Sequence, residues 1–370
     1  MMLSNALQAL SVRCFGQRLQ PGALMSDHST GCRAGMLTTW PDAPHGQCWP
    51  HIIRKLGEGQ FCSKKHPHFE DIPDHFRAIH FSQTAEMRDF FVNEIGKVWD
   101  SWGPKLNLSS FWDEYVVAPW DNWSIGLFDC MLCTPSQQAH ESWHKQILQS
   151  RIPGMFKGST EHVMQVALPR LVSMDAALIP DGLLFSVPGV PRRMLQKAGW
   201  YVDHERTHMH ILQDGSRSTD DPSFTFYVLS QSSKTYKKIN ADLVYRYNAL
   251  LNGVRPKGLT KLQSFIDVAD ALHVVEFAED VDRVAPPSDL NPDGLVCNCK
   301  GFRHVGICSH VMAVGHRLGV IDVPQLCGGM RTEKRKLGGF TKGVRPALER
   351  EEEGSEKKKK KKKKTAKQLK

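Results

Sequence analysis

Four residues in the last quarter of the chain have the types and spacing of a metal site. The stretch reads Cys-x-Cys, eight residues, then Cys-x-His, and its candidate ligands are Cys297, Cys299, Cys308 and His310. Three thiolates and one imidazole form a closed tetrahedral set, with Zn–S distances of ~2.3 Å and a Zn–N distance of ~2.0 Å. Magnesium and calcium prefer oxygen ligands. The spacing therefore predicts structural Zn²⁺, against the alternative that these cysteines are buried as small apolar groups.

The predicted ligands need regular elements that aim them at one point. Cys297 and Cys299 are two residues apart, so a β-strand places both sulfurs on one face. Ser309 has the residue type of a helix N-cap, and the apolar run after it stops at Gly319. This pattern predicts a helix with His310 in its first turn, pointing back toward the thiolates.

The ligand pattern resembles the SWIM zinc finger, which has Cys-x-Cys, a variable gap and Cys-x-His. The helix phrase "CSHVMAVGHRLG" is also similar to that family. SWIM fingers occur on the C-terminal side of Mutator-like element (MULE) transposases and in several nuclear proteins. The resemblance implies bound zinc and a location in the nucleus, but it does not by itself name a function.

A second resemblance lies upstream of the finger. The segment "MSDHSTGCRAGMLTTWPDAPHGQCWPHIIRKL" resembles the part of MULE transposases that carries the second catalytic aspartate, which falls here on Asp27. The segment "TPSQQAHESWHKQI" resembles the family phrase around the third acid, which falls on Glu141. The order of acid, Cys-x-x-His, helical insertion, acid and finger is also similar. The resemblance covers roughly residues 5–175 and the finger.

The family resemblance implies an RNase H-like core in which three carboxylates hold two Mg²⁺ or Mn²⁺ ions for phosphodiester transfer. The family's first aspartate lies well upstream of the second, yet the 26 residues before Asp27 contain no Asp or Glu. We therefore expect no catalysis from the chain as written, with Asp27 and Glu141 as vestigial catalytic positions. Two simpler interpretations remain open: Asp27 as a cap at a strand end, and Glu141 as the helical partner of Lys145.

The remaining cysteines give no closed ligand set. Cys48 and His51 form a Cys-x-x-His pair, and Cys130 and Cys133 form a Cys-x-x-Cys pair. Whether these four residues bind a second metal or pack in the core is left open by the sequence. Ten cysteines in 370 residues do not make a dense disulfide framework, which favours a reducing compartment.

The basic charge of the chain is concentrated at its end. Residues 331–370 contain 17 Lys and Arg and 6 Asp and Glu, a charge of +11 within a total of +9, so the other 330 residues sum to −2. Lys357–Lys364 is an unbroken run of eight lysines. We expect this tail to be disordered and to act in nuclear import or in salt-dependent contact with DNA phosphates. A purely solubilising tail is the alternative.

The pattern along the chain predicts an α+β protein in four parts: residues 1–175, an incomplete RNase H-like region with a helical insertion; 176–285, an α/β accessory region; 286–326, the zinc finger; 327–370, the Lys-rich tail. Apolar periodicity predicts helices near residues 3–19, 83–102, 109–117, 242–251 and 259–270, and strands near 22–27, 225–229 and 272–277. Residues 67–74 are expected to form a loop. Six of the nine tryptophans lie between Trp99 and Trp143, which predicts a helical core.

These observations predict a zinc-binding protein of transposase descent that contacts DNA, protein or both in the nucleus. One alternative is an active DDE-type cut-and-paste transposase whose N-terminal part is missing from the gene model. Another is a protein–protein adaptor that uses the finger without binding DNA. We expect neither a membrane span, because no run of 18 apolar residues occurs, nor a small-molecule substrate.

Overall fold

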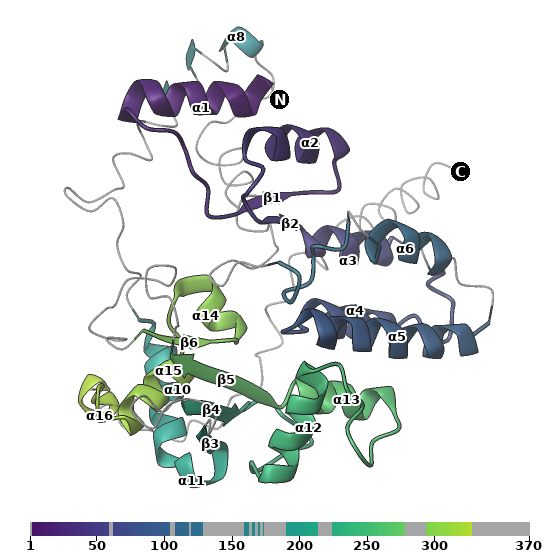
Figure 1. Ribbon diagram of the computed structural model, residues 1–370, viewed down its shortest axis with the longest axis vertical. Helices are drawn as coiled ribbons and strands as arrows, with labels where there is room; N and C mark the ends of the chain where they lie inside the picture. The colour runs from purple at the N-terminus through teal and green to yellow at the C-terminus, as the bar shows by residue number, and fades with distance from the viewer. Residues whose placement is uncertain are drawn as a thin grey trace, which may run out of the picture. The chain divides into compact units, whose positions relative to one another are not determined.

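The structure, a computed structural model, mixes α-helices and β-strands, as expected from the sequence pattern (Figure 1). It describes residues 2–58, 62–103, 108–117, 120–128, 190–213, 224–277 and 294–327, with a few positions between 159 and 173 that include α8 (Thr160–His162). The expected domain boundaries near residues 175 and 285 fall outside these ranges and stay predictions. No helix in the described ranges is long and apolar enough to cross a membrane.

The N-terminal elements include one small β-α-β unit. In order they are α1 (Met2–Phe15), β1 (Leu24–Ser26), α2 (Thr30–Thr39) and β2 (His45–Gln47). Strands β1 and β2 pair in parallel, with Ser26 opposite Gln47, and α2 supplies the crossover that a parallel pair requires. The predicted first helix and first strand are confirmed, but two strands are too few to define a larger fold.

Four helices with an aromatic core follow: α3 (Trp49–Gly57), α4 (Ile72–His80), α5 (Ala85–Ser101) and α6 (Leu108–Tyr115). Trp99 and Trp123 are almost fully buried, which confirms the predicted tryptophan core for these two residues. The expected loop at 67–74 is wrong from Ile72 onward, where α4 begins. Pro73 lies in the first turn of that helix, where a missing N–H is tolerated, so the proline marks a helix start.

A four-stranded antiparallel sheet organises the C-terminal half of the chain. Its four strands are hydrogen-bonded to one another in the order in which they occur along the chain. They are β3 (Met209–Gln213), β4 (Phe224–Leu229), β5 (Leu272–Phe277) and β6 (Leu295–Cys297). Along β4, Phe226 and Val228 are buried on one face, and Tyr227 and Leu229 are buried on the other. Both faces are therefore covered, and the finger's first strand, β6, is an edge strand of this sheet.

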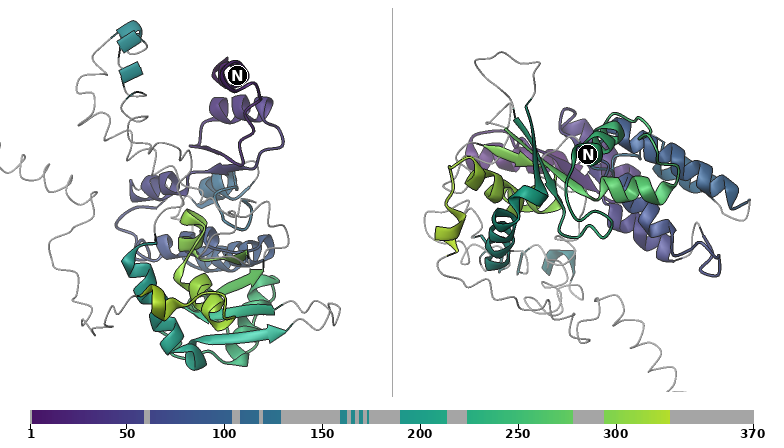
Figure 2. Two further views of the ribbon diagram at one scale, coloured as in Figure 1. Left: turned by 90° about the vertical axis from the view of Figure 1, so that its left-hand side faces the viewer. Right: turned by 90° about the horizontal axis from the view of Figure 1, so that it is seen from below.

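Two sets of helices cover the two faces of the sheet. Helices α12 (Ala241–Leu251) and α13 (Leu262–Ala269) contact α5 and share the hydrophobic core that contains Tyr227. Helices α10 (Arg192–Asp203) and α15 (Ser309–Arg317) lie side by side over the opposite face (Figure 2). The short helices α11 (Glu205–His208), α14 (Lys300–Val305) and α16 (Val323–Leu326) complete this part. The predicted strands and helices between residues 225 and 277 are confirmed.

Candidate metal centre

The first ligand pair lies where β6 turns into α14. The predicted strand through both cysteines is wrong at Cys299, because β6 ends at Cys297 and Cys299 is the N-cap of α14. The backbone N–H of Cys299 donates to the sulfur of Cys297 at 3.4 Å, and that of Phe302 donates to the sulfur of Cys299 at 3.3 Å. Backbone donors of this kind favour thiolates, because they compensate negative charge on a buried sulfur.

The second pair lies at the start of α15. Cys308 is the N-cap of this helix, and its sulfur accepts a hydrogen bond of 3.4 Å from the N–H of Val311. The expected N-cap at Ser309 is therefore displaced by one residue, since the ligand sulfur takes the capping role that a hydroxyl would have. His310 lies in the first turn, as predicted. Gly319 follows the helix with φ of 78°, a left-handed conformation that suits glycine at a helix end.

The four predicted ligands converge on one point. One ligand atom from each of the four residues lies within 4.8 Å of all the others, and all four residues are buried. The Nδ1 atom of His310 lies 3.6 Å from the sulfur of Cys297 and 3.8 Å from that of Cys308. A tetrahedral zinc ion with ordinary bond lengths separates a sulfur and a nitrogen by about 3.6 Å. The geometry therefore fits one tetrahedral metal ion.

The electrostatics of the site also fit a cation. Burial raises the pKa of the Cys297 and Cys308 thiols, whereas hydrogen bonds from those two thiols hold the pKa of Cys299 well below its usual value. Concentrating three negative sulfurs in a buried space is unfavourable unless a cation lies among them. Cys297, Cys299, Cys308 and His310 would hold a divalent ion, which would supply that positive charge and favour the thiolate form of the three cysteines.

Only one of the two predicted catalytic acids, Asp27, lies in the described part of the chain. Asp27 directly follows β1 and is exposed, at the carboxyl end of the β1–β2 pair. Glu141 lies outside the described residues. The expectation that these positions descend from a catalytic site therefore stays a prediction.

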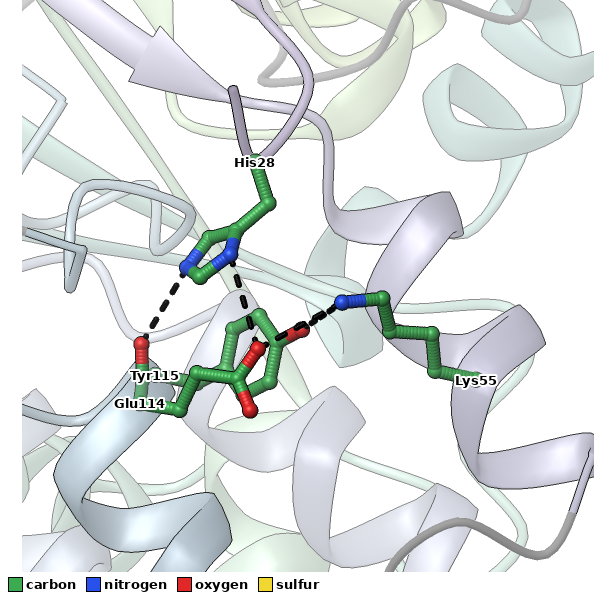
Figure 3. Close-up of polar contacts among 4 residues, drawn as sticks. All are labelled: His28, Lys55, Glu114 and Tyr115. Atoms are coloured by element: carbon green, nitrogen blue, oxygen red, sulfur yellow. Dashed lines mark hydrogen bonds and ion pairs between the residues drawn. The ribbon is translucent and has the colours of Figure 1, made fainter. Parts of the chain in front are cut away.

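The residue after Asp27 belongs to a polar cluster that sequence reasoning missed. The ring of His28 contacts Glu114 through both nitrogens, at 3.5 Å to the carboxylate and 3.3 Å to the backbone oxygen (Figure 3). Lys55 reaches the same carboxylate at 3.4 Å and the Tyr115 hydroxyl at 2.5 Å. These contacts connect the β1–α2 loop, α3 and α6. Nothing in the local sequence signals them, because the partners are 59 to 86 residues apart.

Two of the four residues of the possible second metal site, Cys48 and His51, lie among the described residues. Cys48 is buried at the N-cap of α3, and His51 lies in the same helix. The group formed by Cys297, Cys299, Cys308 and His310 is the only one with metal-ligand geometry in the described ranges. Cys130 and Cys133 lie outside those ranges, so both alternatives for the four residues, a second metal site or core packing, stay open.

Helix α10 is the principal element near the metal centre that sequence reasoning missed. It packs against α15 and brings Tyr201 next to His310. Met194, Ala198 and Tyr201 recur at steps of four and three residues, and all three contribute to hydrophobic clusters. That periodicity was the available signal for a helix in this segment.

Comparison of the chain with models of protein families, with curated proteins and with solved structures found no match.

Proposed function

We propose that residues 286–326 include a structural zinc finger of the SWIM type in a nuclear protein of transposase descent. The observation that supports this most directly is the convergence of three sulfurs and one imidazole nitrogen within 4.8 Å. All four groups are buried and each sulfur accepts a backbone N–H. Four protein ligands would complete a tetrahedral coordination sphere and leave no position for a substrate or a catalytic water. A closed Cys₃His set of this kind is a structural rather than a catalytic zinc site.

The proposed partner is DNA, contacted through its phosphates by the Lys-rich tail. The support is the sequence: residues 331–370 carry a charge of +11, and eight of their lysines are consecutive. Lysines on a chain segment bind phosphates without reading bases, and they release condensed counterions when they do so. The finger then supplies a folded body to which this basic segment is attached.

An active DDE-type transposase is the second candidate, and the position of Asp27 favours it. This carboxylate directly follows β1, at the carboxyl end of two parallel strands joined by a helix. In α/β folds that end of the strands is where functional side chains gather. Activity would require two further carboxylates and Mg²⁺ or Mn²⁺. The diagnostic result is metal-dependent strand transfer that disappears in Asp27→Ala and Glu141→Ala.

Metal content is the first test of the main proposal. The full chain should contain one zinc ion per molecule after purification without added metal, whereas Cys297→Ser and Cys308→Ser should contain much less. Cys14→Ser is the matched control, because that thiol is exposed in α1. A wild-type chain that takes up no zinc, even when refolded with excess Zn²⁺, would refute the zinc finger.

Salt dependence tests the proposed DNA contact. The affinity for a duplex should fall steeply between 50 and 200 mM salt. Changing Lys357, Lys358 and Lys359 to Gln should reduce the slope of log K against log salt by about three, since each phosphate contact contributes roughly 0.9. Lys234, Lys237 and Lys238 are exposed on the folded part and provide the matched triple control. Salt-insensitive binding to a protein partner with no retention on DNA would instead establish the adaptor function.

A further inference from the structure

The ligand His310 has a second polar partner on the side away from the sulfurs. Its Nε2 atom lies 3.2 Å from the hydroxyl oxygen of Tyr201, a residue of α10 that precedes it by 109 positions. Tyr201 is almost fully buried, and its ring contacts the imidazole edge to face with centroids 5.1 Å apart. The hydroxyl therefore lies next to the one imidazole nitrogen that does not face the cysteines.

The geometry assigns different tasks to the two nitrogens of His310. Nδ1 faces the sulfurs of Cys297 and Cys308, so Nδ1 is the atom that would bind the metal. An imidazole nitrogen binds a metal without its proton, which leaves the proton on the other nitrogen. The Nε2–H group then donates to the oxygen of Tyr201. The contact thus satisfies the Nε2–H group of the tautomer that metal binding requires.

The acceptor oxygen is itself held in place. The backbone N–H of Gln231 donates to the Tyr201 oxygen at 3.2 Å, and Gln231 lies just after β4. A phenolic oxygen has two acceptor lone pairs, so it can accept from Gln231 and from His310 together. The ring of His273, on β5, stacks on His310 with centroids 4.3 Å apart and an angle of 26°. The imidazole is therefore fixed in orientation by groups that all lie outside the finger.

We infer that Tyr201 is a positioning residue of the metal centre, whose hydroxyl holds His310 with Nδ1 deprotonated and aimed at the metal. This inference rests on the proposed metal binding and deepens it. It means that the metal centre is completed by α10, more than 90 residues before the first cysteine ligand. Partners of metal-bound histidines contribute about 10- to 100-fold to metal affinity in proteins.

The test is the zinc affinity of full-length Tyr201→Phe, measured by competition with a chromogenic chelator. The variant keeps the buried ring and removes only the hydroxyl, so we expect affinity to fall about 10- to 100-fold. Tyr227→Phe is the matched control. It removes a buried hydroxyl that donates to Asn248 at 2.8 Å, on the sheet face away from the metal centre, and should leave zinc affinity unchanged.

The same substitution in a second variant, His310→Cys, distinguishes a role of Tyr201 in positioning His310 from a general loss of stability. In His310→Cys, four thiolates can still hold zinc, but the imidazole that the Tyr201 hydroxyl contacts has been removed. Adding Tyr201→Phe in that background should change zinc affinity by less than about 2-fold if the hydroxyl acts through His310. An equal loss in both backgrounds would show that Tyr201 only stabilises the fold and would overturn the inference.

Cobalt substitution gives a readout that does not depend on affinity. Saturated Co²⁺ complexes of the wild type and of Tyr201→Phe should differ in their visible d–d bands, because these report ligand orientation, while Tyr227→Phe should match the wild type. Identical spectra with unchanged zinc affinity would overturn the role of Tyr201 and leave the zinc finger intact. A wild type that binds neither metal would overturn both proposals.

Discussion

The side-chain amide of Asn298 donates to the hydroxyl of Tyr247 at a distance of 3.0 Å. Asn298 is the residue between the ligands Cys297 and Cys299, and Tyr247 lies in α12, on the opposite face of the sheet from α15. The oxygen of the same amide accepts the N–H of Val274 at 3.0 Å. The turn that carries two metal ligands is thus attached both to β5 and to a helix beyond it, so the finger is continuous with the sheet.

The first prediction concerns this attachment. Asn298→Ala leaves the buried Tyr247 hydroxyl and the Val274 N–H without these partners, and unsatisfied buried groups cost about 1–3 kcal/mol. We expect the free energy of unfolding of the metal-loaded chain to fall by that amount, as measured by urea denaturation. Asn252→Ala is the control, because Asn252 is exposed at the end of α12 and should change stability by less than about 0.5 kcal/mol. Equal effects from both variants would contradict the attachment.

The second prediction concerns removal of the metal. Structural zinc contributes directly to folding, so excess chelator or Cys308→Ser should unfold β6, α14 and α15. Because β6 pairs with β5, with Cys297 opposite Val275, amide protection should also decrease along β5. Hydrogen exchange read by mass spectrometry checks this, with α5 as the internal reference that should remain protected. Retention of full protection in the finger under excess chelator would contradict a folding role for the metal.

The third prediction concerns acid. His80 is completely buried, its ring stacks on Trp49 with centroids 4.3 Å apart, and its Nδ1–H donates to the backbone oxygen of Trp123 at 2.6 Å. Its Nε2 atom is buried with no hydrogen-bond partner among the described residues. Burial lowers the pKa of His80 from 6.5 to about 3. Protonation therefore occurs more readily in the unfolded chain than in the folded one.

The direction of the pH effect follows from that pKa. Between pH 6.5 and 3 the unfolded state binds the extra proton, so His80 contributes stability that is present above pH 6.5 and is lost as pH falls. From pH 7 to pH 5 the wild type should lose about 2 kcal/mol more than His80→Gln. Urea denaturation at the two pH values measures this difference. His162→Gln, at an exposed position in α8, should retain the pH dependence of stability that the wild type has. If His80→Gln loses as much stability as the wild type between pH 7 and pH 5, His80 is not the source of the effect.

The fourth prediction compares two ion-pair networks. Glu114 contacts Lys55 and His28, but its side chain is 34% exposed, so Glu114→Gln should cost less than about 1 kcal/mol. Glu94 contacts Lys97 at 2.7 Å and Arg255 at 2.5 Å, and its side chain is only 12% exposed. We expect Glu94→Gln to be the more destabilising change and the less sensitive to added salt. The opposite order in urea denaturation at low and high salt would contradict this comparison.

Local features made the metal ligands predictable. The Cys-x-Cys pair at the end of a strand and the Cys-x-His pair at a helix start each fix two ligands within three residues. The stereochemistry of one ion then limits how the two pairs combine. Helix α5 was also predictable from local features, because its apolar positions repeat every three or four residues. Gly319 likewise marked the end of α15. Each of these signals depends on neighbours in the sequence, so each could be read before the fold was known.

The surroundings of the ligands depend on segments that are far apart in the sequence. Tyr201 meets His310 only because α10 packs on α15, and His273 meets the same ring only because α15 also packs on β5. The sequence by itself determined which four residues can bind a metal and the charge of the tail. The tertiary structure alone decided that β6 belongs to a larger sheet and that Asn298 and Tyr201 secure the ligands, because sheet register and helix packing bring together residues that no local pattern connects.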